Sequence, residues 1–216
     1  MRPPDSWRAA RVTLIITVAT FVAWLLVWGF GLLSTPDLIS VFGGFIPGRA
    51  GGIETDLPLV PFVLTPITAT LIHAGWIHVG FNLLFLAFCG RPVETIIGGR
   101  GMVILYLVGA YAAAAAQYAV GPASTTPMVG ASGAISAVLG VYAIMFGRNR
   151  VKVADPRLAL WLNALWLAAA WIGLQLVVGF TFETAGAQIA IAAHIGGFLA
   201  GLLLAKPLLL LRYRGA

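Results

Sequence analysis

Six long apolar segments alternate with short polar or charged stretches along the chain. None of the six contains Asp, Glu, Lys or Arg, and about 20 apolar residues suffice for a helix to cross a bilayer. Lipid offers no partners to an open strand edge, so each segment is predicted to be an α-helix. The predicted spans are residues 12–33, 76–90, 101–120, 129–147, 158–180 and 189–205. The second is short and is expected to extend by a turn.

The long connection 34–75 differs from the other, short connections. It is rich in Gly and Pro, yet it contains the apolar stretches 57–64 and 67–72. A structureless loop of this length is uncommon unless it is functional. We therefore expect this outer segment to fold against the helices and to dip partly into the membrane interface.

Composition places most of the chain in lipid. Of its 216 residues, 60% are hydrophobic and 9% charged, and the mean hydropathy is +0.97, whereas soluble domains carry about 25% charged residues. The net charge of +6 is spread over the ends of apolar runs and forms no soluble basic patch, which argues against a nucleic-acid partner. The prediction is an all-α membrane protein with a single domain over residues 1–216.

The charges also predict the orientation. If the N-terminus faces the cytoplasm, six spans leave only Arg49 of the 13 basic residues on the outside, as the positive-inside rule requires. The prediction is therefore a protein of the cell membrane whose two termini both lie in the cytoplasm. The first apolar run is too long for a signal peptide, and Trp24 and Trp28 fill its end, so it is interpreted as an uncleaved helix.

Polar side chains are costly within the predicted spans, and four of those present are candidates for chemistry. They are Ser132, His194, His78 and Asn82. At about 1.5 Å of rise per residue, they lie roughly 14 to 24 Å from the cytoplasmic charges of their helices. Side chains from three helices thus converge on the middle and outer half of the membrane.

Small residues explain how two of these helices could meet. Stripes of Gly and Ala let membrane helices approach closely. Ser132 borders one such stripe in the fourth span and His194 borders another in the sixth. The stripes are Gly133, Ala137 and Gly140, and Ala193, Gly197 and Gly201.

This grouping suggests nucleophilic catalysis. A serine hydroxyl is a weak nucleophile unless a base takes its proton, and His194 can be that base for Ser132. Neither span contains an acidic residue, so a dyad is expected. His78 and Asn82, four residues apart on one helix face, could donate hydrogen bonds to an oxyanion together with the Ser132 backbone N–H.

Three motifs, in this order and on these spans, resemble those of the rhomboid intramembrane serine proteases. A GxxxE after the second span also fits, and the resemblance covers essentially the whole chain. The motif residues are His73, His78 and Asn82 in HxxxxHxxxN; Gly130, Ser132 and Gly133 in GxSG; Ala193, His194, Gly197 and Gly201 in AHxxGxxxG; and Gly90 and Glu94 in GxxxE.

The resemblance implies a six-helix bundle that cleaves transmembrane proteins, with lateral substrate access and a cap formed by residues 182–188. His73 is expected to order the outer segment against the second helix. Glu94 is expected to anchor hydrogen bonds on the cytoplasmic side, without acid catalysis. The remaining tryptophans are interpreted mostly as belt or lipid-facing residues.

Two positions depart from the family pattern. Bacterial members often carry an aromatic residue four positions after the serine, where its ring packs on the histidine, and this chain has Ser136 there. A Trp-Arg pair common in the outer segment is replaced by Leu64 and Thr65. The residue that orients His194 is therefore not identified by the sequence.

Other functions fit the sequence less well. Three histidines could indicate a metal site, but the sequence has no HExxH motif and no acidic ligand beside them. Neither a metal nor a cofactor is therefore expected. A transporter would need charged or broken helices at the midplane of the membrane, and the predicted spans contain no acidic residue there. A non-proteolytic relative that binds transmembrane helices remains the main alternative, although such proteins typically lose the serine or the histidine.

Overall fold

The computed structural model describes residues 9–29, 36–52, 59–147 and 190–214, and also positions 153, 155, 156, 158, 159, 161–163, 165, 166 and 169–173. Within these residues every regular element is helical. The elements are α1 (Arg11–Gly29), α2 (Pro36–Gly43), η2 (Pro47–Gly51), η3 (Phe62–Leu64), α3 (Thr65–Thr68), η4 (Ala69–Leu71), α4 (Trp76–Phe85), η5 (Leu86–Gly90, a π-helical turn), α5 (Arg91–Val120), α6 (Ser132–Phe146) and α8 (Ile191–Tyr213).

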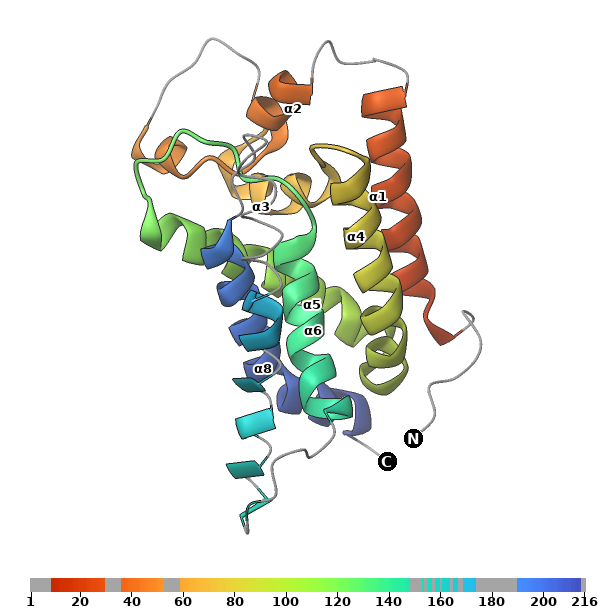
Figure 1. Cartoon of the computed structure of the whole chain (residues 1–216). Helices are drawn as coiled ribbons and strands as arrows, with labels where there is room; N and C mark the ends of the chain where they lie inside the picture. Colours follow the sequence, from red (N-terminus) through yellow and green to blue (C-terminus); the bar gives the residue numbers. More distant parts are fainter. Residues whose placement is uncertain are drawn as a thin grey trace.

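The centre of the molecule is formed by α5, α6 and α8, which pack most extensively against one another. In Figure 1, α1 and α4 stand side by side on one flank of this group. The core between the helices is built from small and branched apolar side chains such as Leu105, Val138 and Ala205. Small side chains shorten the distance between helix axes, so polar side chains on neighbouring helices can come within hydrogen-bond distance.

Two described helical stretches are long and apolar enough to cross a membrane, Trp76–Val120 and Ile191–Tyr213. Arg11–Val27, Phe62–Leu71 and Ser132–Phe146 are shorter apolar helices. The described positions from 156 to 173 in and around the predicted fifth span include helical residues, whereas residues 30–33 and 174–180 lie outside the described part of the chain. The count of six spans therefore stays a prediction.

The predicted end of the second span, 76–90, is too early, because residues 91–97 of the predicted charged connection 91–100 are helical as well. The helix runs through Gly90 to Ile97 and breaks at Gly98, whose φ of 76° and ψ of 164° are not helical. The next helix therefore starts close to residue 101, the predicted start of the third span. The sequence already contained the reason. Val93 and Ile97 are four residues apart on one helix face, and both are buried in the core.

The end predicted for the sixth span is also wrong. Lys206 and Pro207 suggested a stop after Ala205, but α8 continues to Tyr213 with Pro207 inside it. Proline removes one backbone hydrogen bond from a helix interior. Ala205 before the proline and Leu208 after it are both buried, so packing of the last turns offsets that loss. By contrast, α6 begins only three residues after the predicted start of the fourth span.

Glu94 joins the beginning of α1 to α5. Its buried carboxylate accepts hydrogen bonds from the backbone N–H groups of Val12 (2.9 Å) and Thr13 (2.7 Å) and from the Thr13 hydroxyl (2.6 Å). The first N–H groups of a helix lack partners within the helix, and a negative charge there is favourable. Glu94 thus caps α1 from a neighbouring helix.

Glu94→Gln is expected to lower the free energy of unfolding by roughly 1–3 kcal/mol. The glutamine N–H₂ group, itself a donor, would take the place of a carboxylate oxygen that accepts hydrogen bonds from Val12 and Thr13. The measurement is an unfolding titration with SDS in mixed micelles. Thr95→Ala is the matched control, because the Thr95 hydroxyl bonds only to the Pro92 carbonyl three residues earlier. Equal losses in the two variants would contradict the capping role.

The predicted outer segment 34–75 carries five of the short helices and packs on the bundle. Phe45 and Ala69 are buried against Ala114 of α5, and Phe45 exchanges backbone hydrogen bonds with Met128. Residues 53–58 of this segment are outside the described part. Its depth in a membrane stays a prediction.

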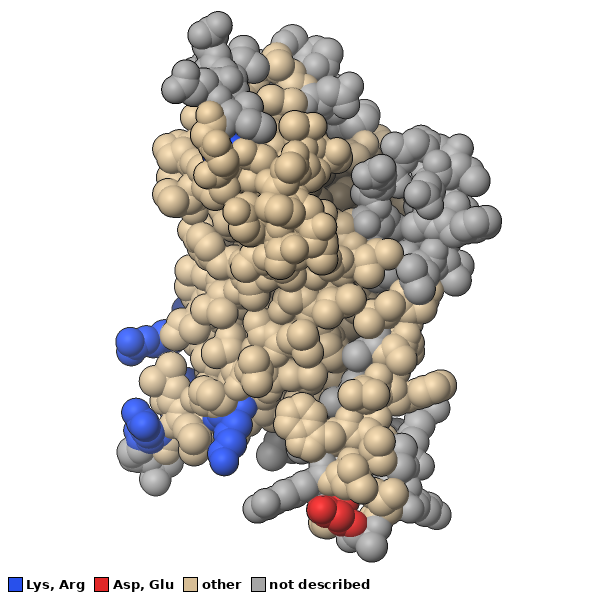
Figure 2. Space-filling view, turned by 90° about the vertical axis from the view of Figure 1, so that its left-hand side faces the viewer, with Lys and Arg blue, Asp and Glu red and all other residues tan. Residues whose placement is uncertain are grey.

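Charge is concentrated at one end of the surface shown in Figure 2. Lys and Arg side chains gather at the lower end, and a nearly uncharged band covers most of the rest. The residues at this end include the start of α1 and the end of α8, because Glu94 bonds Val12 while Arg212 lies against Gly98. Such a band over a helical bundle suits a lipid environment.

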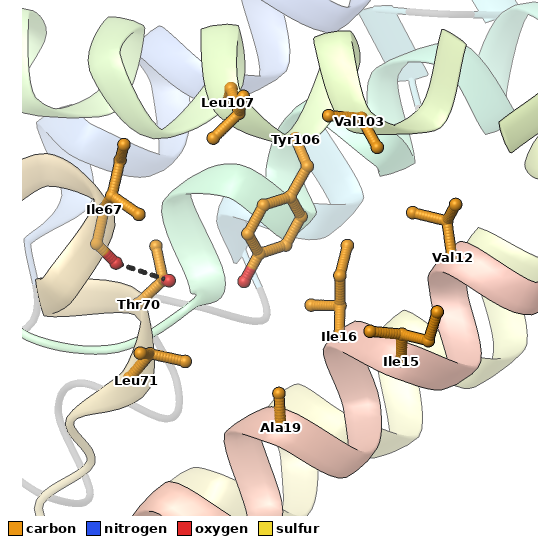
Figure 3. A pocket seen from close by; sticks show the side chains of 10 residues that line it. All are labelled: Val12, Ile15, Ile16, Ala19, Ile67, Thr70, Leu71, Val103, Tyr106 and Leu107. Atoms are coloured by element: carbon orange, nitrogen blue, oxygen red, sulfur yellow. Dashed lines mark hydrogen bonds between the residues drawn. The ribbon is translucent and has the colours of Figure 1, made fainter. Parts of the chain in front are cut away.

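An apolar groove lies between α1, η4 and α5. Figure 3 shows Tyr106 of α5 projecting into it between Ile16 of α1 and Thr70. The Tyr106 side chain is buried, and its hydroxyl has no hydrogen-bond partner among the described residues. The groove contains neither Ser132 nor His194 and is separate from the site described next.

Candidate active site

Ser132 is the first residue of α6, and a tight turn of the backbone places it there. Gly130 has φ +108°, a conformation that residues with a Cβ rarely adopt. Its N–H donates to the Ala69 carbonyl at 2.9 Å, and the N–H of Ala131 donates to His73 Nε2 at 3.4 Å. The outer segment therefore holds the turn that presents Ser132.

His194 lies in the first turn of α8 and faces Ser132. Its Nε2 is 2.6 Å from Ser132 Oγ, a hydrogen bond between residues 62 positions apart. Which of the two atoms donates depends on the imidazole tautomer. His194 is only 5% exposed, and its Nδ1 has no hydrogen-bond partner among the described residues. The pair is thus shielded and contains no carboxylate partner within the described part.

The two small-residue stripes meet and bring the pair together. A Cβ at Gly197 would overlap the carbonyl oxygen of Gly133, and one at Gly201 would overlap the carbonyl oxygen of Ala137. A Cβ at Gly140 would lie 2.5 Å from the Phe198 carbonyl oxygen. The backbones of α6 and α8 therefore touch along about two turns, next to Ser132 and His194.

His78 and Asn82 lie on the face of α4 that approaches the Ser132 turn. A Cβ at Gly130 would be 2.5 Å from His78 Nε2, so the imidazole sits directly over the turn. His78 Nδ1 accepts a hydrogen bond from Ala74 N–H at 3.4 Å. The buried Asn82 donates its Nδ2 to the His78 carbonyl at 2.8 Å. In this structure, then, the Asn82 amide is bonded within its own helix.

His73 lies beneath His78 and supports the turn. The two rings pack edge to face with centroids 4.9 Å apart. Burial, together with the charge of His78, lowers the pKa of His73 to about 3. The imidazole is therefore neutral at physiological pH, which lets Nε2 accept the bond from Ala131.

Sequence reasoning missed Trp171, which reaches the site from the fifth segment (158–180). Its Nε1 donates to Ser136 Oγ at 3.2 Å, and Ser136 Oγ donates to the Ser132 carbonyl at 2.8 Å. The ring centroids of Trp171 and His194 are 6.4 Å apart. The spacing of the tryptophans does not single out Trp171, because the five residues, or about 140° around a helix, that separate it from Trp166 also separate Trp161 from Trp166, and both of these are exposed.

A metal site and a cap were the other features considered from the sequence. Among the described residues no three His, Cys, Asp or Glu side chains are grouped to hold a metal ion. The cap expected at residues 182–188 lies outside the described residues. Leu64 is exposed and Thr65 buried, and the Thr65 hydroxyl bonds the Phe62 carbonyl.

The arrangement can support acyl transfer. A serine hydroxyl at the start of a helix is bonded to a buried imidazole, and the backbone N–H groups of that helix start have no partners within the helix. The helix N-terminus also carries a partial positive charge, which favours a developing oxyanion nearby.

Comparison with known proteins identifies the family of this chain. The Rhomboid domain family matches residues 63–211. Over 135 residues the chain is 31% identical to a rhomboid protease GlpG of Pectobacterium atrosepticum, covering 62% of this chain and 45% of that protein. Over 137 residues it is 31% identical to rhomboid-related protein 2 of Mus musculus, covering 63% and 45%.

A rhomboid protease GluP of Bacillus subtilis is 29% identical over 146 residues, covering 68% of this chain and 25% of that protein. The chain thus spans about half the length, or less, of these curated relatives. The family match includes α4, α5 and α6 and nearly all of α8, and with them Ser132, His194, His78 and Asn82. The chain therefore belongs to the rhomboid family, whose members are embedded in membranes.

Proposed function

We propose that this protein is an intramembrane serine endopeptidase that cleaves transmembrane segments of other proteins through Ser132 and His194. The observation that carries the proposal is the 2.6 Å contact between Ser132 Oγ and His194 Nε2 in a buried, apolar bundle. In the proposal the substrate is a transmembrane helix, which lies in the same lipid as this bundle. In the proposal the protein resides in the cell membrane with both termini cytoplasmic.

In the acylation step Ser132 Oγ attacks the carbonyl carbon of the scissile peptide bond while His194 Nε2 takes the hydroxyl proton. The tetrahedral intermediate collapses, the C–N bond breaks, and His194 returns the proton to the leaving amine. Water then hydrolyses the acyl-enzyme with His194 again as the base. Both steps need only the one nitrogen that faces Ser132.

The oxyanion is stabilised by the Ser132 backbone N–H, by His78 and by Asn82 in this mechanism. His78 is already over the turn before Ser132. The Asn82 amide must exchange its bond to the His78 carbonyl for one to the oxyanion, which requires only rotation of its side chain. Removing a single oxyanion donor typically costs about 10²- to 10³-fold in kcat.

The test uses the chain reconstituted in liposomes with a single-span test substrate whose helix is interrupted by Gly and Pro near its outer end. A fluorophosphonate probe is applied in parallel, and adducts are located by mass spectrometry. We expect a cut within the transmembrane segment and an adduct on Ser132. A matched substrate with an uninterrupted leucine helix should be cut more slowly, because its peptide bonds are less accessible.

Two outcomes would contradict the proposal. A substrate that co-purifies with the chain but is never cut, with no probe adduct, would indicate a protein that only binds transmembrane helices. An adduct on a serine other than Ser132, with cleavage intact, would show that the nucleophile is misassigned.

A further inference from the structure

His194 needs an orienting contact that the catalytic pair itself does not supply. A base in a serine protease is usually held by a third group that bonds its second nitrogen. Here Nδ1 of His194 has no such partner within the described residues. One hydrogen bond to Ser132 leaves the imidazole free to turn about that bond, so packing must fix the plane of the ring.

Trp171 is an aromatic side chain that faces His194 directly and is linked to Ser132 through Ser136. Its ring meets the His194 ring at 63° with centroids 6.4 Å apart. Its N–H reaches the Ser132 carbonyl through the Ser136 hydroxyl. On its other side it packs edge to face on Phe85 of α4, with centroids 4.8 Å apart. One indole therefore connects α4, α6 and α8 at the site.

The burial of Trp171 separates it from its neighbours on the fifth segment. Trp171 is 7% exposed, whereas Trp161 and Trp166 are 51% and 61% exposed. An indole is rarely buried unless its N–H finds an acceptor, and Ser136 provides one. Ser136 is itself fully buried, and its small side chain leaves the space beside His194 that the indole approaches.

We propose that Trp171 is the positioning residue for His194, supplying from the fifth segment the aromatic contact that Ser136 cannot make from α6. This inference rests on the proposed protease function. The contact between Trp171 and His194 matters because there is empty space next to the imidazole. An apolar cavity of about 210 Å³ borders His194, Trp171 and Phe198. Without the indole this cavity grows, and the imidazole gains room to turn away from Ser132.

The variants separate the ring of Trp171 from its N–H. Trp171→Leu removes both, Trp171→Phe keeps a ring, and Ser136→Ala removes only the hydrogen-bonded link. Trp166→Leu, an exposed tryptophan on the same segment, is the matched control. Each variant is measured for kcat and KM on the liposome substrate, for the labelling rate with the small fluorophosphonate, and for thermal unfolding.

Trp171→Leu is expected to lower kcat and the labelling rate by a similar factor, roughly 10- to 100-fold, because a misplaced base costs about that much. KM should stay within about twofold, since the substrate is not the group displaced. Trp171→Phe and Ser136→Ala should each stay within roughly fivefold of the unchanged chain, and Trp166→Leu should match it. The fluorophosphonate is small and does not need the route that a transmembrane substrate takes. If Trp171 only controlled substrate access, Trp171→Leu would therefore leave the rate of labelling by this probe unchanged.

A rescue tests the position directly. Ser136→Phe alone is expected to lower labelling, because the added ring competes with the indole for one space. In the Trp171→Leu background the same change should raise labelling at least fivefold, because the ring now reaches His194 from α6. This reversal of sign is independent of whether Trp171→Leu also lowers the unfolding temperature.

The outcomes distinguish this inference from the proposed function. If the unchanged chain neither cleaves nor labels, the protease proposal itself fails. If it does both, labelling of Trp171→Leu at the unchanged rate would overturn the role of Trp171 alone. Loss in Trp171→Phe as large as in Trp171→Leu, or no gain from Ser136→Phe in the leucine background, would also overturn it.

Discussion

Replacing either Ser132 or His194 by alanine is expected to lower kcat by roughly 10³- to 10⁶-fold, and replacing both is expected to lower it no further. The two residues act as one unit, because the hydroxyl is a useful nucleophile only while Nε2, at 2.6 Å, can take its proton. Once one partner is gone, the other has no remaining function to lose. The measurement is single-turnover cleavage in liposomes.

The control for this prediction is Ser124→Ala. Ser124 lies in the connection before α6, and its hydroxyl accepts a bond only from the Thr126 N–H. This variant should cleave at the unchanged rate. Cleavage by Ser132→Ala at that rate would contradict the proposed mechanism, and so would a double variant slower than both single variants, because two independent contributions would then be adding.

The approach of Ser132 to His194 could be expected from sequence because it depends on local patterns. Small residues repeated every three or four positions mark a helix face that tolerates close contact, and both polar residues border such a face. Depth along a helix also follows from a fixed rise per residue. These features require no knowledge of the other helices, and the structure brings the two residues together.

Contacts that depend on the relative rotation of helices were not predictable in the same way. Trp171 reaches Ser136 across 35 positions of sequence, and nothing in either segment alone specifies that meeting. Glu94 was expected to anchor hydrogen bonds, but its partners Val12 and Thr13 lie more than 80 positions away. Pairings of this kind are decided by packing in three dimensions.

The boundary errors have a different cause. Arg91 predicts the end of the second span, and Lys206 with Pro207 predicts the end of the sixth, because charge and proline are rare inside membrane helices. At the end of a bundle these residues face solvent while their neighbours remain packed. At Arg91 and Lys206, charge therefore marks where the apolar band ends, and the helix continues beyond it. Arg100, by contrast, does lie close to a helix break, at Gly98.

Gly197→Ala is expected to lower both the labelling rate of Ser132, by roughly 100-fold, and the free energy of unfolding, by about 1–3 kcal/mol. The new Cβ would overlap the Gly133 carbonyl oxygen, one residue from Ser132 and one helix turn from His194. The helices must separate, and the hydrogen bond of the pair lengthens with them. Labelling kinetics and SDS unfolding titrations measure the two effects. Gly80→Ala is the matched control, because nothing lies within 4 Å of its added Cβ.

A second glycine shows why this effect depends on the backbone of the opposing helix. A Cβ at Gly133 would lie 2.5 Å from the Ala113 Cβ of α5, which is a side-chain atom. Gly133→Ala should therefore be largely rescued by Ala113→Gly. The Gly197 variant meets a carbonyl that no truncation can remove, so Ala113→Gly should leave its defect unchanged. If Ala113→Gly rescued both variants, general loosening of the bundle would be enough to restore activity. The distance from Ser132 to His194 would then not depend on the specific backbone contact between α6 and α8.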